Sequence, residues 1–296
     1  MKELSIKIGN QIDRWNKKLV ALCHLSREEV FFSSLFPIRY YRLGSGEKKL
    51  LVLHGFADQA ESFLFLVGKL AKEYEIIVPC LPGFDERFSL SPFEYSFENM
   101  ALSLLELTKE RRFNQFHLLG HSIGGALCLK IHSLSAKNIQ SIGLFNSAGL
   151  DLKSVPSIID QIRAGENPFL IKTKAELEQL QALLIVKPNF FIDRLSDWLV
   201  SFFSRNSTRY IRVASDLFRE FEEFEKQDIQ IVELSQVECP VFIIWGTEDR
   251  FFPLALGEEY KKRISNSRLF LIKETGHCPH YEKPFEVKSL LNSLYL

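Results

Sequence analysis

The sequence predicts an α/β fold in which helices flank a mostly parallel central sheet and a helical cap interrupts the series. Short apolar runs of strand length alternate with helical segments over two separate stretches of the 296-residue chain. Such an alternation requires parallel strands joined by right-handed helical crossovers. Between the two stretches the alternation stops, and a mainly helical block follows, with helix breakers at Pro156, Pro168 and Pro188.

The first stretch opens with an apolar run at 48–56, which has the length and composition of a strand buried on both faces. A helix over 62–74 follows, and then a strand over 75–83 that ends in a Pro-Gly pair. Apolar residues at helical spacing predict the next helix over 96–111. The stretch continues with a strand at 116–120, a helix at 123–135 and a strand at 141–149.

The second stretch resumes with a strand at 239–246, a helix from about Pro253, a strand at 267–274 and a closing helix at 284–296. We therefore assign residues 36–149 and 236–296 to the α/β core. Residues 150–235 form the predicted cap, which is inserted after the strand that ends near Gly149.

Residues 1–35 are predicted to form an N-terminal amphipathic helical segment. Its apolar residues recur every three or four positions and share one helix face: Leu4, Ile8, Ile12, Trp15, Leu19 and Leu22. Such a helix either packs on the body of the protein or lies on a lipid surface. The sequence leaves both arrangements open, so peripheral membrane contact through residues 1–25 is one expectation.

Composition narrows the classes of function. The formal net charge of +0, without a basic stripe, gives no electrostatic case for binding nucleic acid. The five cysteines are scattered and form no C-x-x-C pair, which argues against a disulfide framework and against a zinc site. We expect no metal and no cofactor. No signal peptide or membrane-spanning run is visible, so the expected location is cytoplasmic, or peripheral to a membrane; the oligomeric state stays open.

Three polar residues follow three of the predicted strands, namely Ser122, Asp249 and His277. In open parallel sheets, active groups gather beyond the carboxyl ends of the strands. A serine hydroxyl is a poor nucleophile unless a base removes its proton during attack. We expect His277 to be that base and Asp249 to hold the imidazole in the required tautomer. The three residues together predict nucleophilic catalysis.

The nucleophile candidate lies in a G-x-S-x-G pattern, because residues 120–124 read GHSIG. In that pattern a sharp strand-to-helix turn lifts the serine out of the sheet, and the glycines let neighbouring backbones approach. The alternative is that Ser122 only caps the following helix. Because the pattern has a strand before it and a matching acid and base downstream, we favour the catalytic role.

Neighbouring residues compete for the other two roles. His121 adjoins the serine but is held in the backbone of the turn, and His280 lies three residues beyond His277. His277 directly follows a glycine at a strand end, which favours it as the base. Glu248 adjoins Asp249, and the W-G-x-x-D spacing favours Asp249 as the acid.

Acyl transfer also requires donors for the oxyanion, and the loss of one donor costs about 3–4 kcal/mol. We predict the backbone N–H groups of Ile123 and Phe56 as these donors. Phe56 lies in the turn after the first strong strand, where Gly55 lets the chain bend back toward the nucleophile. His54 is expected to brace that turn through hydrogen bonds.

These segments carry a resemblance to a known family: LLVLHGFADQAESF, GHSIGGALCLKI, LFNSAGL, WGTEDRFFP and GHCPHYEKP. The chain resembles the α/β-hydrolase superfamily over nearly its whole length, and within it the capped lipase and esterase branch with its monoacylglycerol-lipase-like members. The order Ser, Asp, His is that of the family's triad. The resemblance implies that Ser122 is the nucleophile, Asp249 the acid and His277 the base, with Phe56 and Ile123 as oxyanion amides.

The chain departs from the family in one loop. Where D-x-P-G-x-G is common, residues 80–85 read CLPGFD. This departure leaves the substrate-side details of the loop open and does not touch the predicted triad.

The leading expectation is hydrolysis of a carboxylic ester with an apolar acyl chain, such as a monoacylglycerol, through an acyl-enzyme on Ser122. Aromatic residues of the cap are expected to form its core, and some of them to line an acyl pocket: Phe169, Phe190, Phe191, Trp198, Phe202 and Phe203. The expected small-molecule partner is therefore an apolar ester.

Two alternatives stay open. The same triad could cleave a carbon–carbon bond, as in meta-cleavage hydrolases, whose acidic substrates need cationic groups. The cap contains candidates for such groups: Arg163, Arg194, Arg205, Arg209 and Arg212. The chain could also be a non-catalytic member of the superfamily that binds a ligand or a partner.

Overall fold

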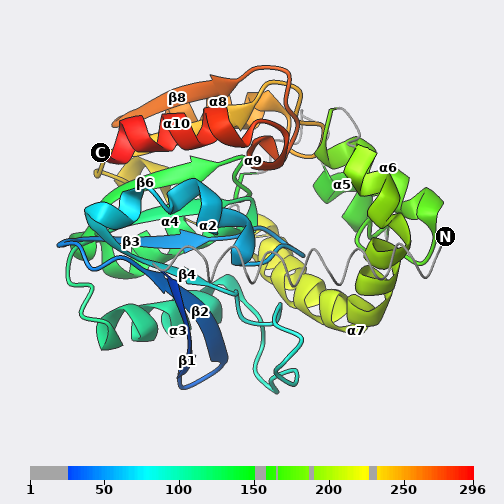
Figure 1. Cartoon of the computed structure of the whole chain (residues 1–296), viewed down its shortest axis with the longest axis horizontal. Coiled ribbons are helices and arrows are strands. Elements are labelled where there is room, and N and C mark those ends of the chain that lie inside the picture. The colour runs from blue at the N-terminus through cyan, green and yellow to red at the C-terminus, as the bar shows by residue number, and fades with distance from the viewer. Residues whose placement is uncertain (1–25, 151–157, 165, 187–189, 227–231) are drawn as a thin grey trace.

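The computed structural model describes residues 26–150, 158–164, 166–186, 190–226 and 232–296 (Figure 1). These residues form an eight-stranded sheet in the order β1-β2-β4-β3-β5-β6-β7-β8. The strands are β1 (Ser26–Phe32), β2 (Pro37–Leu43), β3 (Lys48–Leu53), β4 (Tyr74–Pro79), β5 (Phe116–His121), β6 (Ile139–Phe145), β7 (Val241–Gly246) and β8 (Ser267–Ile272). From β4 to β8 all neighbours are parallel, whereas β2 pairs antiparallel with β1 and with β4. The predicted α/β class with a mostly parallel sheet is confirmed.

The β1–β2 hairpin corrects the predicted helical segment 1–35, because Ser26–Phe32 form an edge strand instead of a helix. The expected helix face and membrane-contact region, residues 1–25, lie outside the described residues. The polar β1 is held by its partner strand. The hydroxyl of Tyr40 donates to Glu29 (2.6 Å) and that of Tyr41 donates to Glu28 (3.0 Å). These partners lie on another strand, so a search for apolar runs does not find them.

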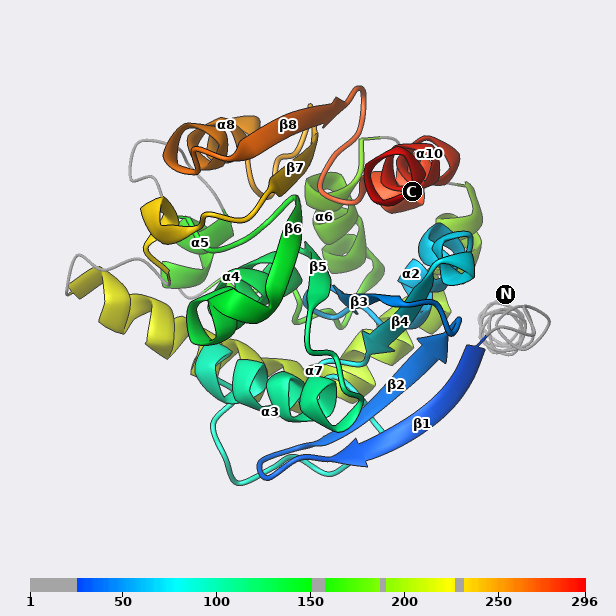
Figure 2. The same cartoon turned by 90° about the vertical axis from the view of Figure 1, so that its left-hand side faces the viewer.

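The sheet is covered by helices on both faces, and the two sides of each central strand enter different cores. Leu51 and Leu53 of β3 join the core that contains residues of α3, α4 and α8, whereas Leu50 and Val52 join the core with residues of α2 and α10. Figure 2 shows α3 and α4 on one side of the sheet and α2 and α10 on the other. The helices of the core are α2 (Glu61–Val67), α3 (Phe97–Glu110), α4 (Ile123–Ser135), α8 (Leu254–Arg263), α9 (Pro279–Glu282) and α10 (Pro284–Tyr295).

Three short 3₁₀ helices complete these connections: η1 (Leu70–Lys72), η2 (Ala136–Asn138) and η3 (Leu234–Gln236). The helix predicted over 62–74 is divided, because α2 ends before Gly68 and η1 continues as a separate turn. The other predicted core helices agree with the observed ones to within a few residues at their ends.

The cap consists of α5 (Ile158–Arg163), α6 (Lys174–Leu184) and α7 (Phe190–Lys226), which lie between β6 and β7 in the chain and to one side of the sheet in Figure 1. The side chains of Phe190 and Phe191 are outside the described part of α7. Arg209 of α7 donates to the carbonyls of Gly83 (3.1 Å) and Phe88 (2.7 Å). The middle of α7 is thereby fastened to the loop after β4. Among the described helices, none has the length and apolarity to cross a membrane.

Candidate active site

Ser122 occupies a strained turn between β5 and α4. Its φ of 54° and ψ of −121° lie in a region that non-glycine residues rarely adopt. A Cβ at Gly120 would lie 2.1 Å from the carbonyl oxygen of Gly124, and one at Gly124 would lie 2.4 Å from the carbonyl oxygen of Leu53. Only glycine fits at both positions. The side chain of Ser122 makes no capping hydrogen bond, so the structure does not support a role as a helix cap.

Asp249 and His277 meet at the carboxyl end of the sheet. His277 Nδ1 lies 2.9 Å from Asp249 Oδ2, and both side chains are buried. Asp249 Oδ1 accepts the backbone N–H groups of Phe251 and Phe252, each at 2.8 Å. The carboxylate is therefore fixed in orientation, and it favours the imidazole tautomer with the proton on Nδ1, which leaves Nε2 free to accept a proton.

Asn146 is a member of this group that the sequence analysis missed. Its Nδ2 donates to Asp249 Oδ2 at 2.7 Å and lies 3.4 Å from the carbonyl oxygen of Gly276. It follows β6 directly and has a φ of 43°. The signal in the sequence was a polar residue after a buried strand, the same signal that identified Ser122.

The serine Oγ forms no hydrogen bond with any described residue, and the contact of this turn with His277 is made by the preceding residue. The neighbouring His121 makes the connection, since its Nε2 donates to the backbone carbonyl of His277 (2.9 Å) and the two rings lie 4.9 Å apart. Catalytic hydrogen bonds are often long before substrate binds. The assignment of the three residues as a catalytic set stays a prediction.

The rival residues are placed elsewhere. His121 is bonded to the His277 backbone, and the ring nitrogens of His280 form no hydrogen bond with any described residue, Nε2 lying 3.9 Å from Asp58 Oδ2. Glu248 is exposed, whereas Asp249 is buried and bonded to His277. Geometry therefore favours Asp249 and His277 over their neighbours.

The predicted oxyanion turn lies beside the serine. Leu53 of β3 pairs with Gly120 of β5, so the loops that follow these two strands are adjacent. A Cβ at Gly55 would lie 3.2 Å from the Cβ of Ser122, which shows how closely this turn approaches the nucleophile candidate. Within the described residues, the N–H groups of Phe56 and Ile123 have no acceptor. Both amides are thus available as the predicted donors.

His54 braces this turn, as expected from the sequence. Its Nε2 accepts the backbone N–H of Leu81 (2.9 Å), so its Nδ1 carries the proton and donates to the carbonyl of Gly55 (2.7 Å). Burial lowers the pKa of His54, and the folded protein therefore holds it in the neutral form.

Replacing His54 by glutamine is expected to make the free energy of unfolding depend less steeply on pH in the acid range. Below the ordinary histidine pKa of about 6.5, the unfolded chain binds a proton that folded His54 does not, so stability falls as pH falls. One such group contributes at most about 1.4 kcal/mol per pH unit. Urea unfolding at pH 7.5, 6.5 and 5.5 measures the slope; equal slopes for wild type and His54→Gln would contradict this role.

One predicted cap residue reaches the site through aromatic contacts. The ring of Phe169 lies 4.5 Å from that of Phe56 and 5.9 Å from that of Phe251. Phe251 in turn lies 4.7 Å from the imidazole of His277. The cap therefore places an apolar surface between the predicted oxyanion turn and the predicted base.

The other described aromatic residues of the cap belong to α7. Trp198 stacks on Phe202 with ring centroids 5.5 Å apart, and Phe203 lies 6.0 Å from Tyr210. Tyr210 contacts Phe56 at 5.7 Å. Phe203 is thus linked to Phe56 through Tyr210, which the sequence analysis did not select.

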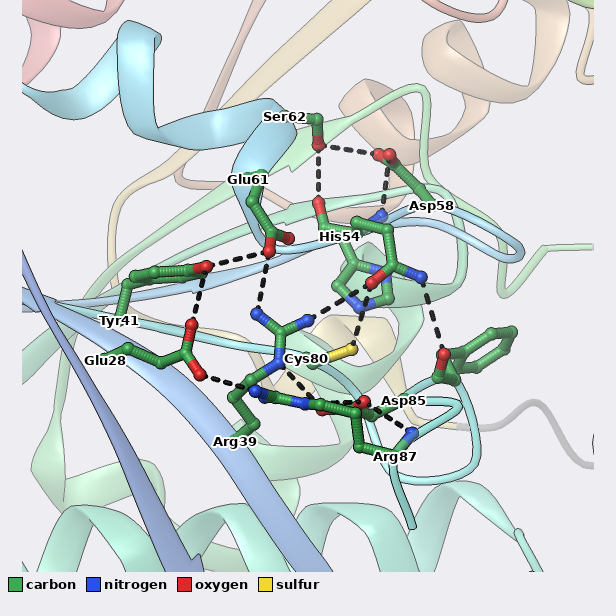
Figure 3. Close-up of polar contacts among 12 residues, drawn as sticks. Glu28, Arg39, Tyr41, His54, Asp58, Glu61, Ser62, Cys80, Asp85 and Arg87 are labelled. Atoms are coloured by element: carbon green, nitrogen blue, oxygen red, sulfur yellow. Dashed lines mark hydrogen bonds and ion pairs between the residues drawn. The ribbon is translucent and has the colours of Figure 1, made fainter. Parts of the chain in front are cut away.

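Arg39 of β2 is the centre of a buried polar network behind the site (Figure 3). Its guanidinium donates to Asp85 (2.7 Å), Glu61 (2.8 Å) and Gln59 (3.3 Å). These contacts join β2, which lies between β1 and β4, to the loops after β3 and β4, one of which carries Phe56. The loop at 80–85, which departs from the family pattern, is therefore held by Arg39 through Asp85.

The comparisons with known proteins agree with this architecture. A family profile described as the alpha/beta hydrolase fold matches residues 48–284. Lipase 1 of Psychrobacter immobilis is 24% identical over 234 residues, which cover 79% of this chain and 72% of the lipase. Monoacylglycerol lipase ABHD6 of Bos taurus is 21% identical over 251 residues, which cover 82% of this chain and 73% of the relative.

A solved structure of a membrane phospholipase A, described as a bacterial virulence factor, superimposes with a TM-score of 0.82. It is 20% identical in sequence, and the match covers 97% of this chain and 91% of the phospholipase. At this identity the likeness confirms the fold alone.

Proposed function

The chain belongs to the α/β-hydrolase fold family, and from that premise we propose that it is a serine hydrolase of carboxylic esters with apolar acyl chains. The observation that carries the proposal is the buried His277–Asp249 pair, 2.9 Å apart, beside the strained turn of Ser122. The lipase relatives support ester hydrolysis as the general reaction.

In the proposed first step, Ser122 Oγ attacks the ester carbonyl while His277 Nε2 takes the hydroxyl proton. Asp249 stabilises the imidazolium that forms. The carbonyl oxygen becomes an oxyanion and accepts hydrogen bonds from the N–H groups of Phe56 and Ile123. Collapse of this intermediate breaks the bond to the alcohol, which leaves with the proton from His277.

In the second step, water attacks the acyl-enzyme while His277 again takes a proton. Collapse returns that proton to Ser122 Oγ and releases the carboxylic acid. The reaction needs no redox partner, because one water molecule is consumed and one ester bond is broken.

The contacts around His277 support an apolar acyl group. Phe56, Phe169 and Phe251 form a continuous aromatic series from the oxyanion turn to the base. Burial of an acyl chain against such a surface contributes about 0.8 kcal/mol per methylene. A monoacylglycerol or a similar lipid ester is the substrate class that we propose, in keeping with the name of one relative, a monoacylglycerol lipase.

The carbon–carbon hydrolase alternative is less well supported. Three of the five cap arginines that it would need are engaged elsewhere: Arg205 pairs with Glu86, Arg209 donates to backbone carbonyls and Arg212 pairs with Asp216. The side chains of Arg163 and Arg194 are outside the described residues.

A substrate panel tests the proposal. We expect kcat/KM for p-nitrophenyl octanoate to exceed that for p-nitrophenyl acetate at least about tenfold. The octanoyl chain has six more methylenes, and burial of about two of them at 0.8 kcal/mol each accounts for a tenfold difference. Monoacylglycerols of graded chain length should follow the same trend. A vinylogous diketone acid, the substrate class of the alternative, should turn over slowly or not at all. Preference for that acid over every ester would refute the ester assignment.

A further inference from the structure

A second polar cluster lies behind the predicted catalytic residues. It is formed by Asp58 in the turn after β3, His121 at the end of β5 and His280 in α9. One ligand atom from each residue lies within 4.8 Å of the other two. The three residues come from three separate segments of the chain, and the two histidines are 3% and 4% exposed.

The imidazoles of this cluster have nitrogen atoms without partners. Both ring nitrogens of His280 and Nδ1 of His121 are buried and form no hydrogen bond with any described residue. Burying a polar group without a partner is costly, so these nitrogens indicate a ligand. The ring of His280 is held in place, since it stacks on Phe63 at 5.2 Å and contacts Phe145 at 5.5 Å.

The surrounding hydrogen bonds orient these groups as metal ligands are commonly oriented. His121 donates its Nε2–H to the carbonyl of His277, which leaves the lone pair of Nδ1 free. Asp58 Oδ1 accepts the N–H of Gln59 (2.8 Å) and the hydroxyl of Tyr281 (2.7 Å). Histidine ligands that donate to a carbonyl, and carboxylate ligands that accept further hydrogen bonds, are typical of protein metal sites.

The second oxygen of Asp58 retains free capacity. Oδ2 accepts the hydroxyl of Ser62 (2.9 Å; Figure 3) and lies 3.9 Å from His280 Nε2. A carboxylate oxygen can accept two hydrogen bonds, so one lone pair remains. Oδ2 of Asp58, Nδ1 of His121 and a ring nitrogen of His280 therefore each have a free lone pair.

We propose that Asp58, His121 and His280 form a binding site for one divalent transition metal ion of the zinc class. Two imidazoles and one carboxylate suit zinc and cobalt better than calcium or magnesium, which prefer oxygen ligands. With bonds of about 2.0–2.2 Å, tetrahedral donors lie roughly 3.4 Å apart. The donor atoms would thus approach one another by at most about 1.4 Å, within reach of side-chain rotation. The sequence analysis expected no metal because it considered only the cysteines, which form no C-x-x-C pair.

Such an ion would tie together the oxyanion turn, the serine turn and the loop of the predicted base. The site excludes Ser122, Asp249 and His277 themselves. Failure of the metal site in a test would therefore leave the proposed hydrolysis unaffected, and the reverse also holds.

Metal titration of the full chain tests the site without substrate. After treatment with a chelator, the protein should bind one equivalent of Zn²⁺ in competition with a chromophoric chelator. Co²⁺ should give visible absorption bands of a low-coordinate site, and Zn²⁺ should raise the thermal midpoint. These measurements use the wild-type protein, so they do not depend on the folding of any variant.

Variants assign the ligands. Asp58→Asn and His280→Gln should each weaken Zn²⁺ binding at least about tenfold, whereas His132→Gln should leave it unchanged, since His132 is a buried histidine of α4 outside the cluster. Circular dichroism of the metal-free variants reports their folding. No Zn²⁺ uptake by the wild type, or an affinity that neither ligand variant changes, would overturn the proposal.

Discussion

Replacing Ser122 by alanine is expected to lower kcat for ester hydrolysis by about 10⁴- to 10⁶-fold, the range typical of a lost nucleophile. The fold should persist, because the serine hydroxyl makes no hydrogen bond to any described residue. A fluorophosphonate probe should label the wild-type protein at Ser122 and fail to label Ser122→Ala. Steady-state kinetics and mass spectrometry of the labelled peptide measure the two effects.

The matched control is Ser103→Ala. Ser103 is a fully buried serine of α3 that donates to the carbonyl of Asn99 (3.0 Å) and has no contact with Ser122, Asp249 or His277 among its hydrogen bonds. Its loss should leave kcat and probe labelling unchanged. If Ser122→Ala hydrolysed esters at the wild-type rate, Ser122 would be excluded as the nucleophile. If the probe failed to label the folded wild-type protein, the result would favour a non-catalytic binding protein.

Replacing Asp249 by asparagine is expected to lower kcat by about 10⁴-fold through the wrong histidine tautomer. Oδ1 accepts two backbone N–H groups, so the carbonyl oxygen of asparagine must take that place. The new amide group then faces His277 Nδ1 and donates to it, which moves the imidazole proton to Nε2. In that form Nε2 cannot accept the proton of Ser122. Kinetics on a short p-nitrophenyl ester measure the loss.

Glu248→Gln is the matched control for this substitution. Glu248 directly precedes Asp249 but is exposed, so its loss should change kcat little. If Glu248→Gln lost as much activity as Asp249→Asn, or if Asp249→Asn kept the wild-type rate, the acid would have been assigned to the wrong residue. Thermal unfolding of both variants separates loss of catalysis from loss of the fold.

The alternation of buried strands and helices was readable from the sequence because it depends on local periodicity. The β1–β2 hairpin was not, because β1 contains charged residues whose partners lie on the neighbouring strand. Tyr40 and Tyr41 satisfy Glu29 and Glu28 only after the two strands pair. A polar edge strand therefore has no local apolar signal.

Most of the candidate site was also predictable, and for a related reason. Ser122, Asp249 and His277 each follow an apolar run, and in a parallel sheet such positions meet at one edge. Asn146 carries the same signal but was passed over, because no chemical role required it until its contact with Asp249 was seen. The catalytic roles themselves stay predictions for the experiments above.

By itself, the sequence determined the fold class, the glycine-flanked turn of Ser122 and the set of polar residues at strand ends. These features depend on residues within a few positions of one another, whose backbone preferences and spacing are local. Tertiary structure decided which distant groups become partners: Arg39 with Asp85, Asp249 with His277, and Asp58 with Tyr281. The physical reason is that a buried polar atom is satisfied by whatever the chain topology brings within about 3 Å, and sequence separation does not report that distance.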